Sequence, residues 1–490
     1  MKVFNPFLLI AILSLFSTLS LYSQSSTLGK SAIIKLSLQE CISRAKTNSF
    51  QKKQAQFSSK ISKNNLQNAQ KEKLPKVSGN FINYLNSGRS IDRYTNLFTE
   101  ETIANQSYGL DVEIPIYQGN QLKNNILIQE INANLAENDL RKTEQNLTID
   151  VLTAFLGVLN AEEQWTIAKQ QVEVSKNQLN RLESLSKEGL TTRMSILEFK
   201  MQLSNDELQE INAENEYILS KTRLLQIMNE PNIIDIEIDR KSIETTTIGE
   251  YKTPITNLLN YSLSNNPSIK NAKGLLEISN LNINISRAML MPTIGFGVSL
   301  GSNYSSAAPK ERFIYSGRNN IIETPTNDYV LVNNKKINLV SSTETPVGYY
   351  KNIGYFGQLT LNFNKIIYLN IKIPIYDGGI TKKRIENAQI IQKISKIQID
   401  ESEAKLKQII ELAYKNMKAS YKRYIAINKQ VIVMEELFLI TKKQILEGAI
   451  SSTDYMTIKS QYDKVKQNQI LYKYDYILRT KILDFYVDSL

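Results

Sequence analysis

The chain has 490 residues, and its composition excludes several kinds of site before any motif is considered. It contains no histidine and one cysteine, Cys41, so histidine-based catalysis, histidine metal sites and an intrachain disulfide are excluded. The formal net charge is +11, but the lysines are scattered beside glutamates and form no patch interleaved with aromatic residues. We therefore expect solvated helix faces, a partly buried Cys41 and no nucleic-acid partner, with anionic lipid as a secondary alternative.

The N-terminal residues have the pattern of a secretory signal peptide. Lys2 precedes an apolar run from Val3 to Leu21, and a cleavage site follows Ser23. We expect residues 1–23 to be removed, with a retained membrane anchor as the alternative. No cysteine lies near the cleavage site, so a lipoprotein-type anchor is not expected. Beyond the leader, no apolar run reaches the roughly 18 residues of a membrane-spanning helix.

The next hundred residues change from a helical to a strand-like pattern. Residues 36–74 are predicted to be helical, and Pro75 ends them and opens a strand at 77–84. After a polar, turn-rich loop at 85–106, apolar and polar residues alternate up to Ile114. That alternation predicts a strand with one apolar and one polar face.

A corner and a very long helix are predicted after this strand. Pro115 and Gly119 belong to the stretch Ile-Pro-Ile-Tyr-Gln-Gly, where the alternation stops. Residues 120–187 contain no proline and would form a helix about 100 Å long at 1.5 Å per residue. Its apolar residues are sparse and spaced by three and four, which is typical of long helices that pack side by side. Gly189 breaks this helix, and a second one is expected to end near Met228.

The same order returns after a mixed linker at 230–255. Residues 256–291 are predicted to be helical and end at Pro292. The strand that follows, 294–300, has apolar residues on one face and small residues on the other, as in a membrane β-barrel. A long loop, rich in Gly, Ser, Asn and Tyr, is expected at 303–356.

The last part of the chain repeats the strand, corner and long helix. Alternation between residues 359 and 373 predicts a fourth strand, and Pro374 and Gly378 lie in a second corner, Ile-Pro-Ile-Tyr-Asp-Gly. Helices are predicted at 379–446 and, after a break at Gly448, at 449–488.

Equal spacings indicate an internal duplication. The corner prolines are 374 − 115 = 259 residues apart, and Glu188-Gly189 and Glu447-Gly448 are also 447 − 188 = 259 residues apart. We therefore expect a signal peptide at 1–23, a first repeat at 24–250 and a second repeat at 251–490. The second repeat contains the longer loop 303–356, and a surface loop tolerates such added length. Its polarity and its position between two strands place it outside the cell if the long helices lie in the periplasm.

The arrangement resembles the TolC-like outer-membrane efflux protein family over nearly the whole mature chain. The two corners and the turns Gly189–Leu197 and Gly448–Met456 carry the resemblance. The stretch Gly88-Arg89-Ser90-Ile91-Asp92, with Thr95 and Asn96, looks like the first loop of the family's Bacteroidota branch. The resemblance implies a mostly α fold with a membrane β-barrel: an α-helical barrel joined to a 12-stranded β-barrel shared by a trimer. Four strands per protomer cannot close a barrel alone, and open edges are not tolerated in lipid.

The resemblance also implies a function. The chain would be the outer-membrane exit duct of a tripartite efflux system, passively conducting substrates from an inner-membrane pump and a periplasmic adaptor. It would lie in the outer membrane of a Gram-negative bacterium, with a large periplasmic part. A conduit for type I protein secretion is the main alternative, and a secreted coiled-coil scaffold or adhesin is an alternative of another class. No Walker loop, Cys/His cluster or nucleophile elbow is present, so no enzyme activity, metal or cofactor is expected.

Gate residues are expected at the helix turns. In this family the second glycine turn carries acidic residues that ring the periplasmic aperture. Asp454 falls on the first acidic position and Thr457 on the second, while Ser195 and Glu198 correspond to them in the first repeat. Three copies of Asp454 would attract cations, as carboxylate rings do in pores. The alternative is that Asp454 only stabilises the start of a helix.

Overall fold

The structure is a computed structural model that describes residues 34–91, 98–100, 102–230, 233, 235–240 and 248–487. The expected signal peptide, its cleavage site after Ser23, and Asp92, Thr95 and Asn96 of the first-loop motif lie outside the described residues. The chain forms two compact units, which we describe separately. The helical unit comprises the described residues of Met1–Ala55, Leu140–Asn265 and Lys405–Leu490, and the sheet unit comprises those of Gln56–Asp139 and Asn266–Ala404.

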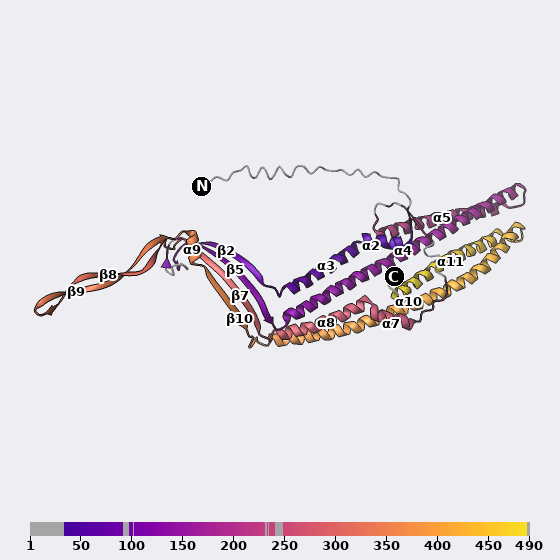
Figure 1. The fold of residues 1–490 in the computed structure, drawn as a ribbon. Helices are drawn as coiled ribbons and strands as arrows, with labels where there is room; N and C mark the ends of the chain where they lie inside the picture. The colour runs from indigo at the N-terminus through magenta and orange to yellow at the C-terminus, as the bar shows by residue number, and fades with distance from the viewer. Residues whose placement is uncertain are drawn as a thin grey trace, which may run out of the picture. The chain divides into compact units, whose positions relative to one another are not determined.

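The helices of the two repeats match in length (Figure 1). Four pairs have 11, 22, 67 and 36 residues in both copies. In that order they are α2 Leu38–Asn48 and α7 Ile255–Asn265, α3 Phe50–Lys71 and α8 Pro267–Ala288, α4 Gln121–Lys187 and α10 Ile380–Leu446, and α5 Arg193–Met228 and α11 Ser452–Val487. The two predicted long helices are thus present, and the equal lengths agree with a duplicated fold.

The segments predicted as single helices at 36–74 and 256–291 are each divided in two. Ser37 caps α2 in a capping box: its hydroxyl accepts from the Glu40 N–H, and the Glu40 carboxylate accepts from the Ser37 N–H. Ser49 separates α2 from α3. In the second copy the Asn266 side chain caps α8 by accepting from Ser268 N–H, and Pro267 lies in the first turn.

The sheet unit contains the four expected strands as one antiparallel sheet (Figure 1). Pro75 and Pro292 directly precede the first and third of these strands, as predicted. The order in the sheet is β10 (Asn364–Lys372), β7 (Thr293–Ser305), β5 (Ile103–Gln118) and β2 (Lys76–Asn86).

The corners differ from the prediction. β5 continues through Pro115 to Gln118, with an irregularity between Pro115 and Tyr117. The strand tolerates this proline because its pairing with β2 ends at Glu113, so the missing N–H removes no bond on that side. β10, in contrast, ends at Lys372, before Pro374. The turns into the long helices use Gly119 and Gly378, at φ +58° and +69°, and so require left-handed backbone.

Two expectations about residues 303–361 are wrong. Most of the predicted irregular loop forms a long antiparallel hairpin of β8 (Glu311–Val332) and β9 (Lys335–Asn352). Asn333 and Asn334 both have positive φ, which matches the primed turns that hairpins favour. Residues 359–361, predicted to begin the fourth strand, lie in a short helix, α9 (Tyr355–Leu361).

Short strands join distant parts of the chain. β1 (Ile34–Leu36) pairs in parallel with β6 (Ile236–Ile238), which lies in the run where the sequence has a β-like pattern. Inside the first loop, β3 (Ser90–Ile91) pairs with β4 (Phe98–Thr99).

The main apolar core lies in the helical unit. It is built around Phe155, Leu224, Met228 and Ile477, and it includes Cys41, which is fully buried. Burial raises the pKa of the Cys41 thiol to about 12, so this cysteine behaves as a small apolar residue. Among the described residues, no helix has the length and apolar content needed to cross a membrane.

Candidate functional site: the two-faced sheet and the helix turns

One face of the four-stranded sheet is apolar and unusually exposed. The register places Val298 beside Val112, and Phe296 beside Leu369. On the edge strand β10, Ile367 is 71% exposed and Leu369 is 57% exposed. A row of large apolar side chains that no other part of the described chain covers needs an apolar environment.

The opposite face is polar and contains small residues. Ser299 Oγ donates to the Asp111 carboxylate over 2.6 Å, and Lys76 lies opposite Glu113. Tyr368 lies over Gly297, where an added Cβ would come within 2.2 Å of the tyrosine ring. Glycine on this face therefore leaves room for a large polar neighbour. Both faces agree with the predicted alternation, including its small residues.

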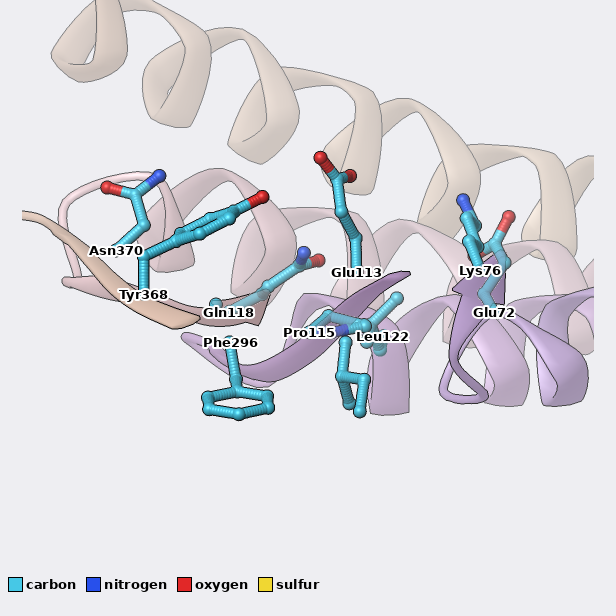
Figure 2. A pocket seen from close by; sticks show the side chains of 11 residues that line it. Glu72, Lys76, Glu113, Pro115, Gln118, Leu122, Phe296, Tyr368 and Asn370 are labelled. Carbon is cyan, nitrogen blue, oxygen red and sulfur yellow. The ribbon is translucent and has the colours of Figure 1, made fainter. Parts of the chain in front are cut away.

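A recess of about 290 Å³ opens on the polar face near the start of the long helix α4 (Figure 2). Tyr368, Glu113 and Lys76 project to this side of the sheet, whereas Phe296 projects to the other side. The lining carries charges of both signs, because Glu72 joins Glu113 and Lys76. The recess gives this end of the polar face a surface suited to water.

Both edges of the sheet are open. β2 pairs only with β5, and β10 pairs only with β7, within the described chain. Because all neighbouring strands are antiparallel, β2 and β10 run in opposite directions and could pair with each other between copies.

Each glycine turn in the helical unit is a Schellman motif. Gly189 has φ +75°, its N–H donates to Ser186, and the N–H of Leu190 donates to Leu185. The second copy repeats the geometry at φ +70°, with Gly448 donating to Ile445 and Ala449 donating to Gln444. The predicted helix breaks are therefore confirmed as sharp left-handed turns.

The helices after the turns begin with matching caps. The Thr192 hydroxyl accepts from the Ser195 N–H over 3.2 Å, and the Ser451 hydroxyl accepts from the Asp454 N–H over 3.1 Å. Ser451 Oγ also donates to the Asp454 carboxylate over 2.7 Å. The capping explanation of Asp454 thus has a direct structural basis, and its role at an aperture stays a prediction.

The helices that follow the two turns pack against each other, but no hydrogen bond or ion pair among the described residues links the predicted gate residues of one turn to those of the other. Phe199 and Tyr455, one residue after Glu198 and Asp454 respectively, stack with ring centroids 5.6 Å apart in a buried cluster. Asp454 and Thr457 are exposed, and Thr457 donates back to the Thr453 carbonyl. Ser195 and Glu198 are half-buried.

A buried charge network near these turns was not predicted. Lys459 is 2% exposed, and its Nζ lies 2.9 Å from Asp206 and 2.8 Å from Asp463. Ser175 and Gln202 also donate to Asp206. Burial raises the pKa of Asp463 from its ordinary value, and the Lys459 cation opposes this effect.

The only sequence signal for the network was the i,i+4 spacing of Lys459 and Asp463, which is common on exposed helices. Asp206 lies 253 residues from Lys459 in the sequence. Lys200 occupies the same place as Lys459 in the first repeat, yet it is exposed and pairs with Glu183 over 3.1 Å.

Comparison with known proteins gives matches in sequence and fold. A sequence model of the family described as "Outer membrane efflux protein" matches residues 41–230. The alkaline protease secretion protein AprF of Pseudomonas aeruginosa is 19% identical over 359 residues. That match covers 73% of this chain and 64% of AprF, so the chain spans slightly less than two thirds of this relative.

Solved structures match over most of the chain. The outer membrane protein VceC of Vibrio cholerae has a TM-score of 0.68 at 12% identity, covering 92% of this chain and 94% of VceC. The open state of the MtrE outer membrane channel of Neisseria gonorrhoeae has a TM-score of 0.69 at 13% identity. The match covers 92% of this chain and 88% of MtrE. The fold is thus TolC-like, mostly helical with a four-stranded sheet. The family model, which matches residues 41–230, agrees with this fold.

Proposed function

We propose that the protein is an outer-membrane channel, the exit duct of a tripartite efflux system. The observation that carries this proposal is the sheet with one exposed apolar face, one polar face and two open edges. A lipid-facing barrel needs apolar residues outside and tolerates polar residues towards a water-filled lumen. The outer membrane efflux protein family, moreover, consists of transport proteins and not enzymes.

The channel is a homotrimer in this proposal. Lipid does not tolerate unpaired strand edges, so β2 of one copy has to pair with β10 of the next. Three copies contribute twelve strands, because each has four in its sheet. TolC-like channels are homotrimers in efflux systems, which supports this number.

Conduction is passive and follows the polar surface. Substrate moves along the Asp111–Ser299 face of the sheet, and the apolar face contacts outer-membrane lipid. The helical unit lies in the periplasm and receives substrate from an inner-membrane pump through a periplasmic adaptor. No group of metal-binding side chains was found among the described residues, and the mechanism requires none.

A conduit for type I protein secretion is the second candidate. The observation in its favour is the similarity to AprF, which is described as an alkaline protease secretion protein. The scaffold or adhesin alternative is weaker, because a soluble scaffold has no use for a sheet with an exposed apolar face. We further propose that the chain belongs to the Bacteroidota branch of the family, on the first-loop motif Gly88-Arg89-Ser90-Ile91-Asp92 with Thr95 and Asn96.

Two neighbouring residues on β10 test the proposal. Leu369 is on the apolar face and Asn370 is on the polar face, so Leu369→Arg and Asn370→Arg introduce the same charge on opposite sides. We expect Leu369→Arg to prevent stable outer-membrane insertion, since arginine facing lipid costs about 2–4 kcal/mol near the membrane midplane. Asn370→Arg should insert and shift planar-bilayer conductance towards anions.

Membrane fractionation and conductance measurements decide the outcome. Equal insertion of both variants, or wild-type protein in the soluble fraction, would contradict the channel. To separate efflux from secretion, the gene is deleted in its own host, and drug susceptibility is compared with the proteins secreted into the medium. Loss of a secreted protein with unchanged susceptibility favours type I secretion.

A further inference from the structure

A groove of about 620 Å³ lies in the sheet unit between the base of the β8–β9 hairpin and α9. On one side it is lined by Arg312 and Lys351, and on the other by Gly357, Thr360 and Leu361. The last three residues follow the i, i+3, i+4 spacing of one helix face. The groove therefore combines two cations with a helix face made of a glycine, a threonine and a leucine.

The two cations lie directly opposite each other. Arg312 and Lys351 are cross-strand partners in the hairpin, where like charges destabilise the pairing. Within the described chain, neither side chain has an ion pair or a hydrogen bond to an acceptor. Glu311 pairs with Asn352, so its carboxylate belongs to the other face of the hairpin. An anion held between the two cations would remove the repulsion.

The groove continues the apolar face of the sheet. Ser302 lies on the same face as Val298 and Leu300 by strand alternation, and its hydroxyl donates to the Leu359 carbonyl of α9. Phe356 of α9 is 79% exposed and Leu361 is 45% exposed. A lipid whose acyl chain lies along the apolar face would thus have its headgroup beside Arg312 and Lys351.

We propose that this groove binds a phosphorylated lipid of the outer leaflet, with its phosphate between Arg312 and Lys351 and its acyl chains along the apolar face. The groove lies at the end of the sheet away from the long helices of the sheet unit. This end reaches the outer leaflet only if the sheet inserts in the membrane as proposed above, so the inference rests on the proposed function. Arginine binds phosphate through paired N–H donors, and lysine adds a second charge. The occupant is a membrane lipid, because the apolar path and the exposed aromatic residue have no role in holding a free anion.

The test compares two double variants of the intact protein in mild detergent. Arg312→Gln/Lys351→Gln removes the two facing cations, and Lys335→Gln/Lys336→Gln removes two charges from the other end of the same hairpin. Lipid A, phosphatidylcholine and inorganic phosphate are titrated separately, and bound lipid is measured by native mass spectrometry. The same spectra report whether each variant keeps the assembly of the wild type.

We expect lipid A to bind the wild type and the Lys335/Lys336 variant equally, and to bind the Arg312/Lys351 variant about 10-fold more weakly, as for charge-assisted hydrogen bonds. The phosphate of phosphatidylcholine is neutralised by its own choline cation, so this lipid should bind all three proteins alike, and inorganic phosphate should not displace lipid A. Equal lipid A binding by all three proteins, or an equal loss in both variants, overturns the site. Displacement by inorganic phosphate shows a free-anion site and overturns the lipid assignment. Wild-type protein absent from the membrane fraction refutes the channel itself, which these titrations do not measure.

Discussion

Lys459 is a residue whose substitution should lower the stability of the fold strongly. Lys459→Met leaves Asp206 and Asp463 buried without their cation, and breaking a buried pair costs about 3–5 kcal/mol. Lys200→Met is the matched control, since this lysine has the same place in the first repeat but is exposed, so it should cost less than about 1 kcal/mol. Guanidinium unfolding, followed through the single tryptophan, Trp165, measures both. Equal costs would show that the network contributes no more than a surface pair.

Asp463 should make stability depend on pH. Its pKa is raised above the ordinary 3.8 in the folded protein, so the folded state holds the proton more tightly. Its contribution to the unfolding free energy is therefore greatest below pH 3.8 and is lost as pH rises through the raised pKa. The unfolding free energy of Asp463→Asn minus that of the wild type should accordingly increase with pH across this window. Glu214→Gln, an exposed carboxylate on α5 with no ion pair among the described residues, is the reference for charge loss alone, and a pH-independent difference for Asp463→Asn would contradict the assignment.

Asp454 is proposed to be the acidic gate residue. Asp454→Asn keeps an oxygen that can accept from Ser451, so the helix cap and trimer assembly should persist. If three copies ring the aperture, the variant should lower cation preference in a planar bilayer. Asp150→Asn, on the exposed surface of α4, controls for the loss of a carboxylate. Wild-type selectivity and conductance in Asp454→Asn would place this residue away from the constriction.

At the scale of elements, the glycine turns fix where the long helices reverse. Gly448 has φ +70°, and no atom lies within 4 Å of an added Cβ, so any penalty comes from the backbone and not from a clash. Gly448→Val should cost about 2 kcal/mol or more locally, whereas Gly448→Asn should cost less because asparagine tolerates this conformation. Hydrogen exchange of peptides covering the turn measures this local opening, which global unfolding does not report. Similar protection in both variants would contradict the left-handed turn.

The elements that the sequence predicted well are those with long, uninterrupted patterns. Neither α4 nor α10 contains proline, and each is closed by Gly-dependent turns, so their bounds could be predicted closely. α9 could not be predicted, because Leu359 and Leu361 continue the period-2 pattern of β10 by coincidence and the helix is held by contacts with β7. The β1–β6 pair and the Lys459 network join segments about 200 and 253 residues apart, so local patterns carry no signal for them. The gate residues came from family resemblance, and their positions at helix starts alone do not define an aperture.

At the scale of the whole molecule, we predict a closed ring of three copies joined between β2 and β10. In a Cys41→Ser background, Ile82→Cys on β2 is combined in turn with cysteines at Ile366, Tyr368 and Asn370 on the same face of β10. We expect one of these pairs to form an intermolecular disulfide, and the mass in mild detergent should equal three copies. Ser299→Cys, on the inner strand β7, should not cross-link with Ile82→Cys, because β5 lies between β7 and β2. A stable monomer in lipid would exclude the shared barrel.

The open edges of the sheet also have a consequence for genetics. In the proposed ring, every copy supplies one edge to each neighbour, so a single chain with a defective β10 leaves the whole barrel unclosed. If mutant and normal alleles are expressed equally and mix at random, only about one ring in eight contains normal chains alone. Loss-of-function alleles that alter β2 or β10 should therefore be dominant, whereas alleles that prevent synthesis of the chain should be recessive.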